Sequence, residues 1–462
     1  MTARSRTPGR ARLWAPPHRP VVAGVFGLMT FIAFESFAVT TAMPVVARSL
    51  GAEQWYSLAF AATAATGLIG MTVGGRWADL RGVRRPLVAG AVLFLAGIAL
   101  CTAAPGMAVF VLGRLFQGVG GGIDSVVLYV IIARFIPEEL RPRMFGLLTA
   151  AWLLPSIAGP LVTGALVELM HWRSVFALVL AGSALSMAVL LNATRSAPSL
   201  DAAASPVDRR GLWAAAAAAA VLVLHLAGQQ QMPWAAVGTV VGAAAAAATA
   251  ARLLPVGTLR ARAGIPRLVA FRGVLGAANA ATDIYLPLYL QHRLDFSPVA
   301  SGAVVAVGAF GWALGAWVQG RSDDPAGSPA SLRAAALLAL CGPVAALGLV
   351  VGVVPLWGAV LGCVLMGTGM GLAYPQVSST VLALSPVGEQ GGNSSALQVS
   401  ESLGVSLLVA VTGAVLTASA LTGYGLVYGV IVGTALLAVV LAAAFTRPSP
   451  GGPTAPPGPP AG

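Results

Sequence analysis

Five charged side chains fall inside long apolar stretches of this 462-residue chain: Glu35, Arg114, Asp124, Asp283 and Glu401. A charge at the centre of a lipid bilayer costs at least about 2.5 to 3.5 kcal/mol, so each needs a physical reason to be there. Burial raises the pKa of a carboxylic acid, which allows an acid to take up a proton on one side of a membrane and release it on the other. We therefore predict that the acids Glu35, Asp124 and Asp283 couple transport to protons. The alternative for each is an ion pair or polar contact that only holds two helices together.

A substrate cavity is the second site that these positions suggest. We predict that Glu35, Trp152, Asp283, Trp312 and Glu401 line it, because both tryptophans also fall in the middle of apolar stretches. Four acids against one arginine favour a cationic or polar small molecule, and aromatic faces contact cations well. The alternative for the two tryptophans is ordinary helix packing.

The elements that must hold these residues are transmembrane helices. The chain is 57% hydrophobic and only 9% charged, which is unusual for a protein that folds in water. Crossing about 30 Å of hydrocarbon takes roughly 20 helical residues. The sequence predicts an all-α integral membrane protein with fourteen helices, near residues 21–46, 56–77, 86–104, 107–134, 144–168, 174–193, 211–228, 233–253, 267–291, 298–320, 333–352, 355–382, 392–419 and 424–446.

The orientation follows from the arginines, which are the only basic residues besides four histidines. Most of them, including the run from Arg252 to Arg272, fall at alternate helix ends; only Arg48, Arg173 and Arg293 fall at the opposite ends. Cytoplasmic loops carry such an excess of basic residues. We expect a multi-pass protein of the cell (inner) membrane with both termini in the cytoplasm. The net charge of +12 is then not a nucleic-acid footprint, and no nucleic-acid partner is expected.

An internal repeat predicts two related halves. Residues 113–122 (GRLFQGVGGG) resemble residues 362–371 (GCVLMGTGMG), and residues 75–82 resemble residues 320–327. Paired halves of this kind rock about a central site in secondary transporters. The predicted organisation is a basic cytoplasmic tail (1–20), an N-terminal six-helix bundle (21–193), a linker (194–210), two extra helices (211–253), a linker (254–266), a C-terminal six-helix bundle (267–446) and a disordered cytoplasmic tail (447–462).

Other chemistry is not supported. The chain contains no lysine, so it cannot contain the GxxxxGK[ST] phosphate-binding loop of an ATP-driven pump. Its four histidines and three cysteines are scattered without the spacing of a catalytic or metal site. We expect neither an enzyme nor a protein that requires a cofactor or metal.

Residues 75–85 (GRWADLRGVRR) are similar to the signature loop of the major facilitator superfamily, between its second and third helices. The resemblance implies a cytoplasmic gate formed by Gly75, Asp79, Gly82 and Arg84, in which the acid and the arginines form a charge lock. Arg114 begins the sequence RLFQGVG, which resembles the family's fourth-helix pattern RxxQGxG, whose arginine is implicated in proton coupling.

Two further segments resemble the fourteen-helix drug:proton antiporters of that superfamily. Gly159, Pro160 and Gly164 are similar to the antiporter kink, and the segment from Glu35 to Pro44 is similar to the first-helix signature. The resemblance implies a monomer in the lipid bilayer that exports small amphipathic or cationic compounds in exchange for protons. The alternatives are a proton-coupled transporter of one metabolite, or a membrane scaffold or sensor that has the same fold but transports nothing.

Overall fold

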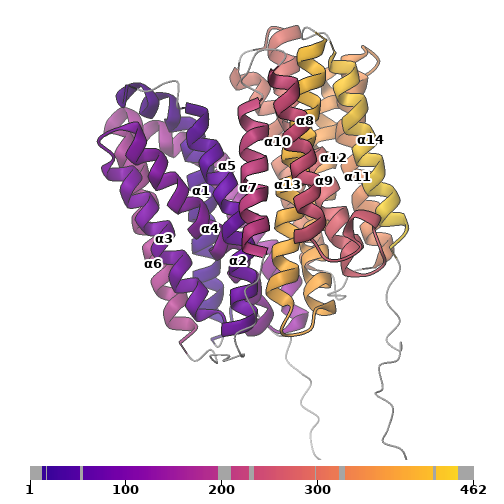
Figure 1. Cartoon of the computed structure of the whole chain (residues 1–462). Helices are drawn as coiled ribbons and strands as arrows, with labels where there is room; N and C mark the ends of the chain where they lie inside the picture. Colours follow the sequence, from indigo (N-terminus) through magenta and orange to yellow (C-terminus); the bar gives the residue numbers. More distant parts are fainter. Residues whose placement is uncertain are drawn as a thin grey trace, which may run out of the picture.

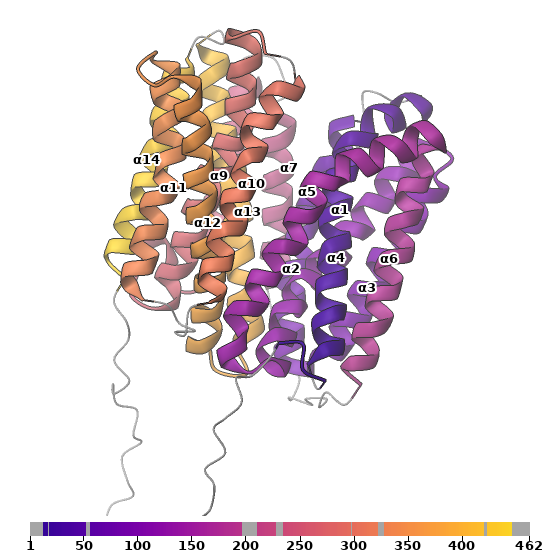
Figure 2. The same cartoon turned by 180° about the vertical axis from the view of Figure 1, so that it is seen from behind.

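The computed structural model describes residues 13–16, 18–51, 56–195, 210–227, 234–296, 298–321, 328–419 and 423–445, and the regular structure in these ranges is helical (Figures 1 and 2). The predicted tails 1–20 and 447–462 and the linker 194–210 lie mostly outside the described residues. The helices are α1 (Arg19–Ser49), α2 (Tyr56–Arg81), α3 (Arg84–Ala103), α4 (Met107–Phe135), α5 (Arg141–Leu169), α6 (Trp172–Ala193), α7 (Arg210–Ala227), α8 (Trp234–Leu253), α9 (Ile265–Arg293), α10 (Pro298–Gly320), α11 (Pro329–Val350), α12 (Leu356–Leu384), α13 (Gln390–Ala418) and α14 (Tyr424–Ala443), with short 3-10 turns at Glu138–Leu140 and Thr258–Arg260.

Each predicted apolar segment overlaps one of these helices, and most of the helices extend a few residues beyond it. Within the described residues, nine helices are long and apolar enough to cross a membrane by themselves, and a bent pair of segments in α5 would make ten. The apolar stretches of α7 and α8 are shorter. The number of membrane spans therefore stays a prediction.

Local sequence explains several helix ends. Proline occupies the first turn of α1, α5, α9 and α11, where its missing N–H group costs nothing. Ser328 caps α11 by accepting a hydrogen bond from the backbone N–H of Ser331 at 3.0 Å. Gly82 follows the end of α2 with φ of 78°, a left-handed conformation that glycine adopts without the steric penalty of a side chain.

Helices α1 to α6 form one bundle and α9 to α14 form a second (Figure 1). The repeated glycines have the same packing role in both. Gly118 and Gly122 of α4 face α2, as Gly367 and Gly371 of α12 face α10. Gly120 faces α3, as its repeat partner Gly369 faces α11. Any larger side chain at these positions would collide with the neighbouring backbone, so the repeat preserves close helix contacts.

The two bundles meet at one end and separate toward the other (Figures 1 and 2). We call the end where they meet the arginine-rich end, because the α2–α3 turn and the starts and ends of neighbouring helices place Arg81, Arg84, Arg141, Arg143 and Arg321 there. Helix α2 packs against α13 and α5 against α10 across the two bundles. The α7–α8 hairpin packs against α2 and α13.

Candidate functional site

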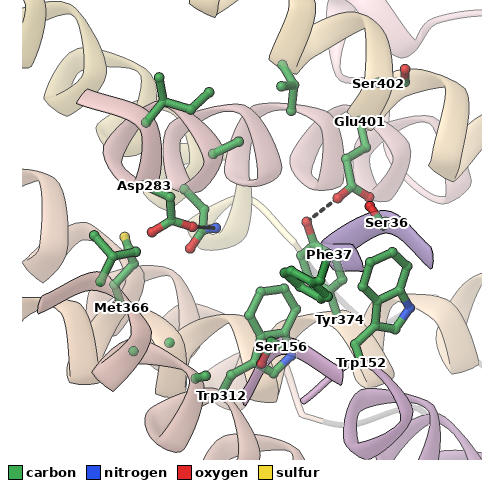
Figure 3. Close-up of a pocket in the computed structure, with 18 of the residues that line it drawn as sticks. Ser36, Phe37, Trp152, Ser156, Asp283, Trp312, Met366, Tyr374, Glu401 and Ser402 are labelled. Carbon is green, nitrogen blue, oxygen red and sulfur yellow. Dashed lines mark hydrogen bonds between the residues drawn. The ribbon is translucent and has the colours of Figure 1, made fainter. Parts of the chain in front are cut away.

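A cavity of about 1910 Å³ lies between the two bundles. Its wall comes from α1, α2, α4 and α5 on one side and from α9, α10, α12 and α13 on the other, with a contribution from α7 and α8. Most lining residues are apolar or aromatic, and the polar ones include Ser36, Ser156, Gln398 and Ser402 (Figure 3). Such a site can hold a largely apolar molecule and bind a few polar groups.

Aromatic side chains from both bundles line the same part of this cavity (Figure 3). Phe37 of α1 and Trp152 of α5 are in edge-to-face contact, with ring centroids 6.3 Å apart. Trp312 of α10 and Tyr374 of α12 are in a similar contact at 5.3 Å. The structure therefore places the two predicted tryptophans in one cavity, and each pairs with an aromatic residue of its own bundle.

Asp283 is the acid on the opposite part of the cavity wall (Figure 3). Its carboxylate accepts a hydrogen bond from the side-chain amide of Asn279, one helical turn earlier, at 2.9 Å. Among the described residues no arginine forms an ion pair with it. Its carboxyl group therefore lines the cavity without a competing arginine among the described residues.

Glu401 belongs to a buried cluster that the sequence analysis did not foresee. Arg272 donates a hydrogen bond from Nε to Glu401 at 2.9 Å and another from Nη1 to the hydroxyl of Ser378 at 3.0 Å. Tyr374 donates its hydroxyl to the other oxygen of Glu401 at 2.6 Å, and its ring lies 4.1 Å from the guanidinium of Arg272. Arg272, Tyr374, Ser378 and Glu401 all line the cavity.

This cluster corrects two expectations: that Arg272 lies at a helix end, and that four acids face only one arginine inside the bundles. Arg272 was counted with the arginines at the helix ends, but its side chain is buried inside the second bundle. Its position two turns into α9 (Ile265–Arg293), within an apolar run, is the signal that could have shown this. Among the described residues the bundles thus hold two buried arginines, Arg114 and Arg272, and the charge of Glu401 is already paired.

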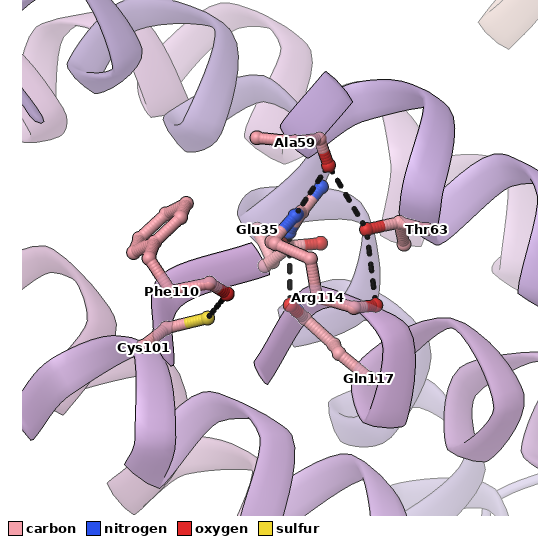
Figure 4. A network of polar contacts seen from close by, with 7 residues as sticks. All are labelled: Glu35, Ala59, Thr63, Cys101, Phe110, Arg114 and Gln117. Atoms are coloured by element: carbon pink, nitrogen blue, oxygen red, sulfur yellow. Dashed lines mark hydrogen bonds and ion pairs between the residues drawn. The ribbon is translucent and has the colours of Figure 1, made fainter. Parts of the chain in front are cut away.

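Glu35 and Arg114 form a second buried ion pair, between α1 and α4 (Figure 4). Arg114 also donates to the side-chain oxygen of Gln117 at 2.8 Å and to the backbone carbonyl of Ala59 at 3.2 Å. The hydroxyl of Thr63 donates to the carbonyl of Arg114 at 3.3 Å. The cluster therefore ties three helices of the first bundle together.

The expectation that Glu35 lines the cavity needs correction. Its neighbours Ser36 and Phe37 line the cavity, whereas Glu35 does not. The reason is the ion pair, because Arg114 holds the carboxylate within the first bundle.

Asp124 lies apart from both clusters. It is fully buried in α4, and neither carboxylate oxygen has a hydrogen-bond partner among the described residues. It faces the backbone of Gly90 in α3, and it is not among the residues that line the cavity. The four predicted proton-coupling residues thus occupy three separate places.

The predicted gate lies where α2 crosses α13 at the arginine-rich end. Asp79 accepts hydrogen bonds from the backbone N–H groups of Gly391 and Gly392, each at 2.8 Å. A side chain on Gly75 would collide with the carbonyl of Gly391, so the two helices touch through glycines. Asp79 thus binds the first turn of α13, where unpaired N–H groups and the helix dipole attract an anion.

The predicted charge lock between Asp79 and Arg84 is not what the structure contains. Arg84 is exposed, and it makes no hydrogen bond or ion pair with Asp79 among the described residues. The arginine beside the acid is instead Arg134 of α4, which donates to the carbonyl of Ala78 at 3.3 Å.

Helix α5 bends by 42° between the segments Glu138–Gly159 and Val162–Leu169. The bend falls at the predicted kink; the side chain of Pro160 lies outside the described residues. A Cβ on Gly159 would touch Phe37 of α1 at 3.3 Å, whereas a Cβ on Gly164 would meet nothing within 4 Å. Gly159 therefore permits a close contact between α5 and α1, whereas no neighbouring helix lies close to Gly164.

Sequence comparison finds related transporters. The sequence profile of the Major Facilitator Superfamily matches residues 25–409. A "Probable multidrug-efflux transporter" of Mycobacterium tuberculosis is 28% identical over 339 residues, which cover 68% of this chain and 69% of that protein. An "Uncharacterized MFS-type transporter" of the same species is 28% identical over 305 residues, and the match covers 63% of this chain and 44% of that protein.

Solved structures show the same architecture. The human organic anion transporter MFSD10 superposes with a TM-score of 0.70 at 16% identity, covering 93% of this chain and 100% of that one. A bacterial homologue of the iron transporter ferroportin, in an outward-facing state, superposes with a TM-score of 0.63 at 13% identity, covering 93% and 98%. At these identities the likeness concerns the fold alone, and it confirms the predicted all-α transporter fold.

Proposed function

Because the chain belongs to the Major Facilitator Superfamily, whose members are membrane transporters, we propose that it exports small amphipathic or cationic compounds in exchange for protons. One observation carries the proposal. The cavity between the bundles combines an apolar, aromatic wall with Asp283, an acid that no arginine neutralises among the described residues. A lipophilic cation matches both features, because its apolar part contacts the rings and its charge meets the carboxylate.

The arginine-rich end is assigned to the cytoplasm by the positive-inside rule. The contacts of Asp79 with Gly391 and Gly392 then close the cytoplasmic side, and the cavity faces outward. To load a substrate from the cytoplasm, the bundles must rock so that α2 leaves α13. The two hydrogen bonds of Asp79 break in that step and form again when the cavity returns to the outward-facing state.

Proton coupling is assigned to two acids with different surroundings. Asp283 lines the cavity, so a proton and a cationic substrate compete for the same carboxylate. Glu35 lies behind the cavity wall, where a proton would neutralise it and break its ion pair with Arg114. Arg114 would keep its bonds to Gln117 and Ala59, so this cluster has two arrangements that differ by one proton. Asp124 is a third candidate, because it is a buried acid whose carboxylate oxygens have no hydrogen-bond partner among the described residues.

The membrane potential can drive the exchange of one proton for a neutral compound, whereas the exchange of one proton for a singly charged cation moves no net charge and is driven by the pH difference. One charge that moves across the membrane releases about 2.3 kcal/mol per 100 mV. Since 1.4 kcal/mol corresponds to a tenfold concentration ratio, one proton can concentrate a neutral substrate by well over tenfold.

Transport of a lipophilic cationic dye by the purified protein in liposomes tests the proposal. We expect an imposed proton gradient to drive dye transport, a protonophore to abolish it, and Asp283→Asn to abolish it as well. Asp295→Asn is the matched control, because Asp295 is exposed on the loop after α9 and contacts no substrate site.

Each component can fail separately. Dye transport that persists with the protonophore would rule out proton antiport. Normal dye transport by Asp283→Asn would remove this acid from the substrate site. A folded protein that moves no cationic dye would overturn the export proposal and favour a narrow metabolite transporter or a non-transporting protein.

A further inference from the structure

The hairpin of α7 (Arg210–Ala227) and α8 (Trp234–Leu253) lies in the seam between the two bundles, against α2 and α13 (Figure 1). Leu224, Ala227 and Thr239 of this hairpin line the central cavity. The wall of the cavity is therefore not built from the two six-helix bundles alone.

Buried small side chains hold the hairpin in the seam. They belong to one apolar cluster with residues of both bundles, which includes Leu68 of α2, Ala217, Ala220, Val221 and Leu224 of α7, Ala246 and Ala250 of α8, and Leu397 and Leu403 of α13. Lipid tails are as apolar as these side chains, so close van der Waals packing rather than removal from water stabilises such contacts inside the bilayer. The cluster shows that the hairpin packs against both bundles.

The two helices of the hairpin also pack closely on each other. A Cβ on Gly242 would lie 2.9 Å from Leu224, and a Cβ on Gly238 would lie 2.8 Å from Ala227. The neighbours of these two glycines are thus the residues of α7 that line the cavity. The opposite face of α8 is exposed and apolar, as Val237, Val240 and Val241 show, which suits contact with lipid.

The second seam, between α5 and α10, differs. Its contacts lie near the arginine-rich end, where a Cβ on Gly146 would approach the carbonyl of Ala316 at 3.2 Å. Farther from that end, Ile157 and Phe310 line the cavity and are 47% and 63% exposed. Helix α12 packs against both α5 and α10, whereas among the described residues the α7–α8 hairpin packs against neither.

We propose that the α7–α8 hairpin is a wall of the substrate site: Ala227 and Thr239 contact the apolar part of a bound amphipathic compound. By filling the α2–α13 seam, the hairpin also leaves the α5–α10 seam as the side on which the cavity meets the lipid. The substrate class in this inference rests on the proposed function. The contact of Ala227 and Thr239 with the substrate rests on the position of the hairpin.

Protection of single cysteines from a water-soluble maleimide tests the contact. Thr239→Cys places a thiol on the cavity wall, Val240→Cys places one on the lipid-facing side of the same helix, and Ser402→Cys places one in the central cavity (Figure 3). The purified full-length protein is labelled in liposomes, with and without a lipophilic cationic dye. Mass spectrometry separates the new labels from those on Cys101, Cys341 and Cys363.

We expect the maleimide to label Thr239→Cys and Ser402→Cys. Dye at ten times its Kd should slow both reactions about tenfold, because the free fraction of the site falls by the factor 1 + [L]/Kd. Val240→Cys, on the lipid-facing side, should stay unlabelled by the water-soluble reagent with and without dye.

The outcomes separate the two proposals. If dye protects Ser402→Cys but not Thr239→Cys, the hairpin is not part of the substrate site, although the export proposal stands. If dye protects neither cysteine while both are labelled, the proposed substrate class is wrong. If Thr239→Cys is not labelled at all in protein that labels at Ser402→Cys, Thr239 does not face the cavity and the inference fails. A Thr239→Ser variant that transports dye normally shows that substitution at this position does not by itself unfold the protein.

Discussion

Asp79 of α2 accepts the backbone N–H groups of both Gly391 and Gly392 in the first turn of α13, so one carboxylate joins the two bundles at their arginine-rich end. Both carboxylate oxygens are used, at 2.8 Å each. A negative charge at a helix N-terminus is worth about 0.3 to 1 kcal/mol on an exposed surface and up to about 2 kcal/mol when partly buried. The Asp79 carboxylate therefore contributes to holding the gate closed.

The first prediction concerns the charge of Asp79. We expect Asp79→Asn to favour the state that is open at the arginine-rich end, because the amide keeps one acceptor oxygen and loses the charge. The equilibrium should shift by about 1 to 2 kcal/mol, or roughly 5- to 30-fold. Distances between spin labels on α2 and α13 would measure the shift; Asp295→Asn should leave them unchanged, and an unshifted Asp79→Asn would show that the carboxylate does not hold the gate.

The second prediction separates proton coupling from substrate binding. Glu35 is paired with Arg114 and does not line the cavity. We therefore expect Glu35→Gln to abolish transport driven by a proton gradient. The Kd for a cationic dye should stay within about twofold of the parent value, a change in binding free energy of less than about 0.5 kcal/mol. Flux assays and equilibrium dye binding on the same preparation check both parts.

Stability is the control for Glu35→Gln. Removing one partner of a buried ion pair can cost about 3 to 5 kcal/mol, so lost transport is informative only if the melting temperature shows folded protein. A loss of dye affinity as large as the loss of transport would contradict the assignment and place Glu35 in the substrate site.

Much of the helical frame could be predicted from the sequence. The apolar stretches are long and are interrupted by arginine, proline or glycine, and these patterns mark helices without knowledge of tertiary contacts. The repeated glycines at 113–122 and 362–371 likewise predicted that the halves are related, and in the structure they face equivalent neighbours.

The partners of the charged residues could not be predicted in the same way. Asp79 binds backbone N–H groups, which every residue except proline has, so nothing in the sequence marks Gly391 and Gly392 as its partners. Arg272 follows a series of arginines near the start of α9, and only the register of that helix shows that its side chain points inward to Glu401. The distance of Glu35 from the cavity depends on the rotation of α1, which its apolar composition does not determine.

The third prediction concerns the cluster of Arg272, Tyr374 and Glu401. We expect Glu401→Gln to lower stability by about 3 to 5 kcal/mol, because it leaves a buried guanidinium without its counter-charge. Tyr374→Phe removes one hydrogen bond to a charged group and should cost about 1.5 to 3 kcal/mol. Thermal unfolding of the two variants in the same detergent checks this order.

A double variant tests whether the cluster acts as one unit. If Tyr374 stabilises the protein through Glu401, the cost of Tyr374→Phe should be much smaller in the Glu401→Gln background, because the shared hydrogen bond is already weakened. Strictly additive costs would show that the charge of Glu401 does not strengthen the 2.6 Å contact between the two side chains.

The fourth prediction uses the close crossing of α2 and α13. A Cβ on Gly391 would collide with the backbone carbonyl of Gly75, whereas a Cβ on Gly388, three residues earlier and exposed, would meet nothing within 4 Å. We expect Gly391→Ala to destabilise the closed gate by about 1 to 3 kcal/mol, the usual cost of overpacking. Because the collision exists only while the helices touch, the substitution should favour the state open at the arginine-rich end rather than unfold the protein.

The reactivity of a cysteine on the cavity wall, such as Ser402→Cys, measures this shift. In the Gly391→Ala background it should react faster from the arginine-rich end, by about 5- to 150-fold, while Gly388→Ala should leave the rate unchanged. Equal rates in the two glycine variants would mean that α2 and α13 do not touch in the population that the reagent samples, and the glycine crossing would then not be part of the gate.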